Sequence, residues 1–212
     1  MAKIKNGILG PVSGKVGSVV ACNGKQGNHV RAYPKKSNKP PSEKQKAQRK
    51  KFGLVQKFLT PMRDLLTFSF ASEFISMGAS KLASSYNLKN AVRGVYPNYY
   101  IDYSLVWMSF GYLPAAVSTA VNSVEAGKLL FTWTDNSGQG KASPGDRTIL
   151  VAYYSENGSC RTLIQGAERQ AGTDVLDVTG WSGRKVHCWL GFVSKDGKDK
   201  SPGMYVGEVV VK

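Results

Sequence analysis

The last hundred residues repeat one short pattern, and this repeat restricts the fold more than any other feature of the chain. Apolar and polar residues alternate over short runs, and turn residues, including Asn-Gly and Asp-Gly pairs, separate them. The runs cover 115–121, 128–135, 147–154, 160–165, 173–179, 184–194 and 204–212. Seven short strands over about a hundred residues are typical of an all-β sandwich.

The clearest of these runs is 184–194, with the sequence RKVHCWLGFVS. Side chains alternate between the two faces of a strand. The run therefore divides into Val186, Cys188, Leu190 and Phe192 on one face and His187 and Trp189 on the other. We expect the first face to line the core and Trp189 to be exposed.

Positive charge is concentrated in the first quarter of the chain. The net charge is +15. Residues 1–57 carry 14 Lys plus Arg and one acid, Glu43, which gives +13; the other 155 residues carry 15 bases and 13 acids, which gives +2. Such asymmetry indicates a polyanionic partner or a basic arm. A solvated segment that only aids solubility is the alternative.

Residues 1–41 read as a glycine-rich basic arm. Two β-branched runs in KVGSVVACNGKQGNHVRAY (15–33) flank the turn NGKQG, which predicts a hairpin. Pro34 ends the hairpin, and the polar, proline-rich connector PKKSNKPPSEK disfavours helix and sheet.

Residues 42–112 read as a helical region with one aromatic strand. Ser42 and Gln45 match a capping box for a helix over 42–59, whose first turns are polar and basic and whose last turns are amphipathic. Pro61 can start a second helical piece, and 78–94 fits a weak helix. Alternation over 103–108 predicts a strand. The expected architecture is thus an α+β N-terminal region with a basic arm, followed by an all-β sandwich over 113–212.

The stretch GPVSGKVGSV (10–19) looks like a phosphate-binding loop but departs from one. A Walker A loop has four residues between its glycines and a hydroxyl residue after Lys, whereas here there are three residues, and Val16 follows Lys15. The glycine spacings do not match a dinucleotide fingerprint either. We read the stretch as extended chain whose glycines permit close packing or sharp bends.

Other catalytic patterns are also missing from the sequence. The three cysteines, Cys22, Cys160 and Cys188, have no metal-ligand spacing and read as small buried hydrophobes, with one pair open as an alternative. There is no nucleophile elbow, and Asp174 and Asp177 would point to opposite faces of a strand. We expect no enzyme activity, no metal and no cofactor.

No long apolar run and no secretory signal pattern is found. We therefore expect a protein without a membrane span that is cytoplasmic at synthesis.

Residues 113–212 resemble a fibronectin type III domain. The matching features are Trp133 late in the second run, Tyr153 and Tyr154 ending the third, Leu176 in the fifth and a long sixth run leading into KDG. Where that family usually has a tyrosine at the start of the sixth strand, this chain has Val186. The resemblance implies a fibronectin type III or neighbouring immunoglobulin-like sandwich.

The N-terminal half resembles an uncharacterised family, a domain-of-unknown-function family seen mainly in Bacteroidota. NGILGPVSGKVGSVV, RAYPKKSNKPPSEKQKAQRKKF and YPNYYIDYS carry the resemblance. It implies a lineage and supplies no catalytic residue.

Three function hypotheses follow. The first is a non-enzymatic structural protein that self-assembles, as in a phage or virus-like particle, so that the mature protein sits within a particle. Its expected assembly surface consists of Tyr96, Tyr99, Tyr100, Tyr103 and Trp189.

The second hypothesis is a sequence-nonspecific nucleic-acid-binding protein. Its expected phosphate contacts are Lys15, Lys25, Arg31, Lys35, Lys36, Lys39, Lys44, Lys46, Arg49, Lys50 and Lys51. The third is a surface adhesion module, by analogy with the sandwich fold.

Overall fold

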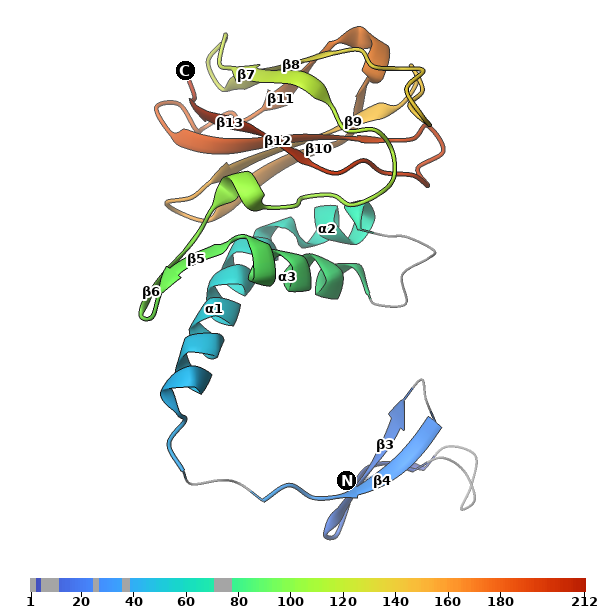
Figure 1. Ribbon diagram of the computed structural model, residues 1–212, viewed down its shortest axis with the longest axis vertical. Coiled ribbons are helices and arrows are strands. Elements are labelled where there is room, and N and C mark those ends of the chain that lie inside the picture. The colour runs from blue at the N-terminus through green and yellow to red at the C-terminus, as the bar shows by residue number, and fades with distance from the viewer. Residues whose placement is uncertain (1–2, 5–11, 25–26, 36–38, 71–77) are drawn as a thin grey trace. The chain divides into compact units, whose positions relative to one another are not determined.

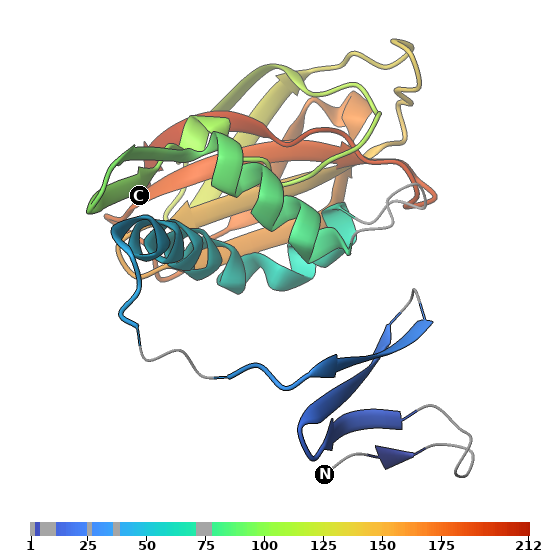
Figure 2. The same cartoon turned by 60° about the horizontal axis from the view of Figure 1, so that its bottom comes forward.

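The computed structural model describes residues 3–4, 12–24, 27–35, 39–70 and 78–212. The chain divides into two compact units, Met1–Ser42 and Glu43–Lys212. The segments 42–112 and 113–212, which we expected as two separate parts, lie almost entirely in the second unit. This is because the helices pack directly on the sandwich, as Figures 1 and 2 show.

The first unit is an antiparallel sheet in the order β1-β2-β3-β4. Its strands are β1 (Lys3–Ile4), β2 (Val12–Val16), β3 (Val19–Gly24) and β4 (Gly27–Ala32). The predicted hairpin is confirmed, because β3 pairs with β4 and places Cys22 opposite His29. The loop-like stretch forms strand β2 and a turn at Gly17, whose positive φ of 56° suits glycine. A strand follows that turn, where a phosphate-binding loop would lead into a helix.

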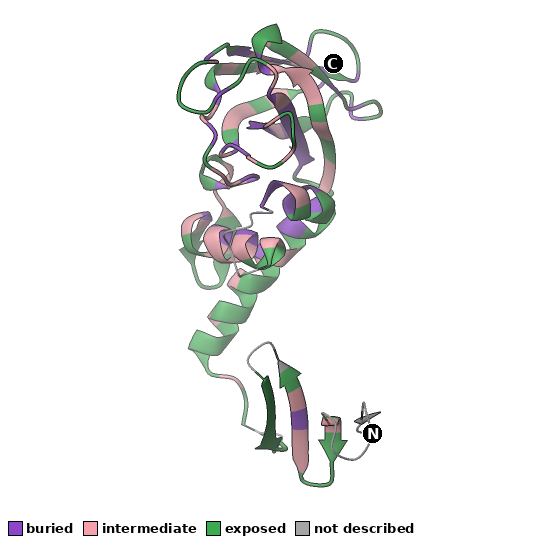
Figure 3. Cartoon of the chain, turned by 90° about the vertical axis from the view of Figure 1, so that its right-hand side faces the viewer, coloured by how far each residue is buried: buried purple, intermediate pink, exposed green. Residues whose placement is uncertain are grey.

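The second unit begins with three helices. They are α1 (Glu43–Leu59), α2 (Arg63–Ser69) and α3 (Ala79–Asn90), with a 3-10 turn at Thr60–Met62 between the first two. The predicted first helix is confirmed, and its polar start and apolar end are both present. Val55, Phe58 and Leu59 are buried, whereas none of the first ten residues of α1 is. Figure 3 shows this contrast along α1.

A short hairpin follows the helices. Strand β5 (Val92–Val95) pairs with β6 (Asn98–Ile101), and the Tyr96–Pro97 peptide bond between them is cis. The strand predicted over 103–108 is wrong. The chain forms a 3-10 turn at Tyr103–Leu105 and then an irregular extended segment. Val106 and Met108 alternate there because both enter the core, not because the segment pairs with a sheet.

The sandwich has two antiparallel sheets, ordered β11-β8-β7 and β10-β9-β12-β13. Each of the seven predicted runs overlaps a strand, and β10 extends beyond its predicted run at both ends. The strands are β7 (Val117–Asn122), β8 (Lys128–Thr134), β9 (Arg147–Tyr154), β10 (Ser159–Glu168), β11 (Thr173–Asp177), β12 (Lys185–Val193) and β13 (Met204–Val210).

One hydrophobic core fills the space between the two sheets. Strand β8 contributes Leu129, Phe131 and Trp133, and strand β12 contributes the four residues that the alternation assigned to one face: Val186, Cys188, Leu190 and Phe192. Trp181 also belongs to this core, and its backbone N–H donates to the carbonyl of Val178 at 3.0 Å. Trp181 thus packs the corner before β12. Near this corner, Val186 stands where fibronectin type III domains usually have a tyrosine.

A second core lies between the four-stranded sheet and the helices. Here Ile149, Val151, Tyr153 and Trp189 meet helical residues such as Phe58, Leu65 and Leu66. The expectation that Trp189 is exposed is wrong, because its exposed fraction is 0%. Alternation placed Trp189 correctly on the opposite face of β12 from Cys188, but the helices cover that face. The molecule therefore has three layers in its second unit, and the four-stranded sheet is the middle one.

Candidate interaction surfaces

The titratable residues of the second core form an aromatic cluster. The Nδ1 atom of His187 lies 3.0 Å from the Tyr205 hydroxyl, and the His187 ring stacks on Tyr103 with 4.0 Å between centroids. Burial lowers the pKa of His187, and the charge of Glu208 opposes this shift. Burial also raises the pKa of Tyr205 to about 12. This histidine is packed between the rings of Tyr103 and Tyr205.

The cysteines offer no reactive thiolate in the sandwich. All three are free. Burial raises the pKa of both Cys160 and Cys188 to about 12, so both stay protonated near neutral pH. Within the described ranges, no three His, Cys, Asp or Glu side chains are grouped so that they could hold a metal ion. None of the described helices is long and apolar enough to cross a membrane.

A buried ionic network closes one end of the sandwich. The Arg169 guanidinium is wholly buried and donates from Nε to Asp146 at 3.1 Å and from Nη1 to the Asn136 side chain at 2.6 Å. It also lies 3.8 Å above the Phe192 ring. Burial lowers the pKa of Arg169, while Asp146 raises it. Because every group in the network is paired inside the protein, we assign the network a structural role.

The N-terminal sheet presents two chemically different faces. Paired residues of adjacent antiparallel strands share a face, and the register pairs Val16 with Val19 and Ala21 with Val30. One face carries an apolar group, which we call the valine face: Val12, Val16, Val19, Ala21, Val30 and Ala32. The paired residues Asn23 and Asn28 lie on the same side at the end of the β3–β4 hairpin. Among the residues of the valine face only Ala21 is buried; Val30 is 66% and Val16 is 50% exposed.

The opposite face of the same sheet is polar and basic. Lys15 and Arg31 lie there, since both pair with Val20 on β3. The Lys15 ammonium also lies 4.0 Å from the Tyr33 ring centroid. Two residues of the predicted phosphate-contact set thus share this face, while Lys25 and Lys36 lie outside the described residues. Lys35 and Lys39 lie in the connector and are exposed.

The rest of the predicted phosphate contacts lie on α1. Lys46, Arg49, Lys50 and Lys57 follow one another at helical spacing and are all exposed, on the side opposite the buried Val55. We call these four residues the basic strip. Lys44 and Lys51 lie outside this strip: Lys44 is exposed, and Lys51 is partly buried.

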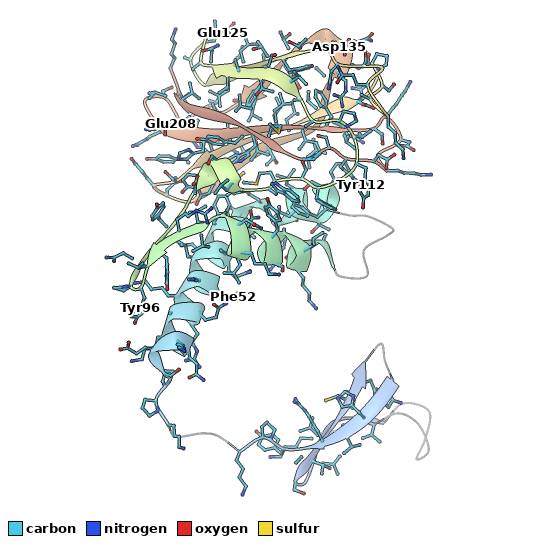
Figure 4. All side chains as sticks on the ribbon, viewed as in Figure 1. Phe52, Tyr96, Tyr112, Glu125, Asp135 and Glu208 are labelled. Atoms are coloured by element: carbon cyan, nitrogen blue, oxygen red, sulfur yellow. The ribbon has the colours of Figure 1, made fainter. Side chains whose placement is uncertain are left out.

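Helix α1 packs beside the β5–β6 hairpin. The Lys51 ammonium lies 4.8 Å from the ring centroid of Tyr99 on β6, and Tyr96 lies 6.5 Å from Tyr99, ring to ring. Tyr100 points to the other face of the hairpin, where it pairs with Arg93 and is 60% exposed. Figure 4 shows the labelled Tyr96 at the end of the hairpin, on the same side of the unit as α1.

The predicted assembly residues therefore separate into two groups. Tyr96, Tyr99 and Tyr100 lie together on the hairpin, and Tyr96 and Tyr100 are exposed. Tyr103 instead packs against Phe58 and His187 in the second core, and Trp189 is buried there. Trp189 therefore cannot belong to a surface, whereas Tyr103 is partly buried.

Three surface features were missed by reading the sequence. They are the valine face, the exposed Phe52 on α1, and Arg93 beside Tyr100. The valine face had a signal in the sequence, because Val30 and Ala32 alternate with His29 and Arg31. Arg93 had none, since its position beside Tyr100 depends on the register of the hairpin.

The second unit defines a three-layer protein in which helices cover one sheet of a β-sandwich. The chain belongs to a family of unknown function, DUF6266, whose model matches residues 11–207. This confirms the expected membership of an uncharacterised family. No match is found among curated proteins.

Solved structures similar to the chain include two with fibronectin type III domains. One is the solution structure of the fn3 domain of the human collagen alpha-1(XX) chain, with 10% identity and a TM-score of 0.36; the match covers 46% of this chain and 85% of that one. The other is the crystal structure of the chicken CNTN1 FN1-FN3 domains, with 7% identity and a TM-score of 0.37; it covers 48% of this chain and 33% of that one.

Proposed function

We propose that the protein is a non-enzymatic structural protein that assembles with further copies of itself, and that the valine face makes the contact. The observation that supports this proposal is the exposure of Val30 and Val16 on a sheet with no core of its own. In the described part of the first unit, Ala21 is the one buried hydrophobic residue. A small sheet gains stability by packing an apolar face against another element.

The chemistry of the valine face favours a flat, uncharged partner. Its valine and alanine side chains carry no charge, and the neighbouring Asn23–Asn28 pair on the same side of the sheet is polar but uncharged. Two such faces can pack against each other as stacked sheets do, about 10 Å apart. The same patch then serves on both copies, as in a two-fold symmetric contact.

The distribution of charge makes this face more suitable than the opposite one for contact with a second copy. Residues 1–42 contain eight bases and no acid, so two N-terminal units repel each other. Lys15 and Arg31 lie on the opposite face, and joining two valine faces keeps these charges apart. A phage or virus-like particle would repeat this contact many times.

The experiment compares two single substitutions in the full-length, nuclease-treated protein. Val30→Lys places a charge on the valine face, and His29→Lys places one on the opposite face of the same strand, at a neighbour that is also exposed. We expect the wild type and His29→Lys to run as assemblies in gel filtration with light scattering, and Val30→Lys to run as the 23.0 kDa chain. A wild type that is monomeric at all concentrations, or equal assembly of both variants, would overturn the proposal.

A further inference from the structure

We propose that the basic strip of α1 and the β5–β6 hairpin bind single-stranded nucleic acid, with phosphates on the helix and bases on the tyrosine rings. This site lies in the second unit, and it is independent of the valine face.

The first observation is uncompensated positive charge. Between residues 44 and 63 the chain has seven bases and no acid. Among the described residues, Lys46, Arg49, Lys50 and Lys57 form no ion pair, whereas Lys128 and Lys185 of the sandwich pair with Glu125 and Glu208. Lys46 and Lys57 are eleven residues apart, which spans about 16 Å along a helix. A linear row of cations of this length fits a linear polyanion.

The second observation is a set of exposed rings on the β5–β6 hairpin, which contacts α1 on the side that carries Lys51. Tyr96 and Tyr100 are 43% and 60% exposed, although tyrosine rings usually gain stability by burial. Lys51 joins the helix to the hairpin through its contact with the Tyr99 ring. Sequence-tolerant binding of single strands combines these two elements, cations along the backbone and aromatic platforms for unstacked bases.

The pairing of Arg93 with Tyr100 strengthens this platform. The two residues are opposite each other on the outer face of the hairpin, so a cation stands beside an exposed ring. A nucleotide stacked on Tyr100 would bring its phosphate within reach of Arg93. A duplex keeps its bases stacked on each other, so it could use the basic strip but not the rings.

Two other occupants fit the surface less well. A second copy offers little opposite charge, since residues 113–212 carry eleven bases and ten acids. An anionic membrane calls for a helix with a continuous apolar face, and the exposed apolar residue on α1 is Phe52 alone within the described helix. A polyanion with planar, stackable groups matches both the charge and the rings.

The first test measures binding of a fluorescent oligo-dT strand and of a matched duplex to the full-length protein. Tyr100→Ala removes an exposed ring on the hairpin, and Tyr112→Ala removes an exposed ring in the loop before β7. We expect Tyr100→Ala to weaken binding of the single strand at least about five-fold and to leave duplex binding unchanged. Tyr112→Ala should match the wild type. Equal loss in both variants, or no loss in either, would overturn the proposal.

The second test uses the salt dependence. For single strands, the slope of log K against log salt is about −0.7 for each phosphate neutralised. Replacing Lys46 and Lys50 together by Gln should therefore reduce the slope by about 1.4, while Lys195→Gln in the sandwich should not change it. Gln keeps the helix propensity of Lys, so the helix is retained. Binding to phosphatidylserine vesicles with none to the oligonucleotide would show a membrane surface and overturn the proposal.

Discussion

The ring of Phe58 on α1 lies 6.5 Å, centroid to centroid, from the indole of Trp189 on β12. Phe58 also meets Tyr153 edge to face at 4.9 Å. These contacts join the helices to the four-stranded sheet, since both sheet residues point away from the sandwich core. Trp189 thus stabilises the junction of two layers.

We predict that Trp189→Ala lowers the free energy of unfolding by about 3–5 kcal/mol, the usual cost of deleting a large buried ring. Tyr112→Ala should change it by less than about 0.5 kcal/mol, because that ring is largely exposed. Urea denaturation followed by circular dichroism measures both values. A folded, fully stable Trp189→Ala protein would contradict the burial of this residue.

We predict that Asp146→Ala costs about 3–5 kcal/mol because it leaves the buried Arg169 guanidinium without its carboxylate. Replacing both residues by apolar ones, Asp146→Leu with Arg169→Met, should cost clearly less than the sum of the two single changes. A double-mutant cycle in urea measures this coupling. Additive costs would show that the two side chains act separately.

We predict that His187 lowers the free energy of unfolding as the pH drops below about 6.5, the pKa of a histidine in the unfolded chain. Its pKa is lowered in the folded protein, so the unfolded chain binds the proton first. The contribution is present above pH 6.5 and is lost as the pH falls towards the folded pKa. Glu208 and Lys185 face the ring and act on the same pKa in opposite directions.

The matching control is His187→Phe, which retains a ring beside Tyr103 but binds no proton. Its free energy of unfolding should stay flatter than that of the wild type between pH 7.5 and 5.5. Carboxylates with lowered pKa, such as Glu208 and Asp177, act below this range, because their unfolded values lie near 4. The same slope in both proteins would rule out His187 as its source.

We predict that one thiol per native chain reacts quickly with Ellman's reagent at pH 8, and that it is Cys22. Cys160 and Cys188, with pKa values of about 12, should react after denaturation. Cys22 pairs with His29 on the face of β3 opposite the valine face, so assembly should leave it reactive. A Cys22→Ser variant should lose the fast phase, and a fast phase that persists would contradict the assignment.

The strands of the sandwich could be predicted because each is a short, largely apolar or alternating run between clear turns. The run 147–154 coincides with β9 at both ends. Alternation cannot say what covers each face, however. Trp189 was expected on the surface because the helices that bury it are more than a hundred residues away in sequence. A strand buried on both sides needs no polar face, and six consecutive residues of β12 from Cys188 to Val193 are buried.

The surfaces were predicted in part. Composition alone located the bases of α1, since a run of Lys and Arg with no acid has few roles inside a core. Tyr96, Tyr100 and Tyr103 looked alike in sequence, yet the first two are exposed and Tyr103 packs on Phe58. The difference arises at Ile101, where the hairpin ends and the chain turns towards the sheet. No local pattern marks that change of direction.

The middle position of the four-stranded sheet limits how this architecture can be cut or recombined. A domain that moves between proteins by genetic shuffling must have a polar surface on every side that solvent reaches. Residues 113–212 alone would present Ile149, Val151, Tyr153 and Trp189 to solvent. This sandwich therefore depends on its helices, and a fragment that begins at residue 113 should precipitate, whereas one that begins at Glu43 should fold.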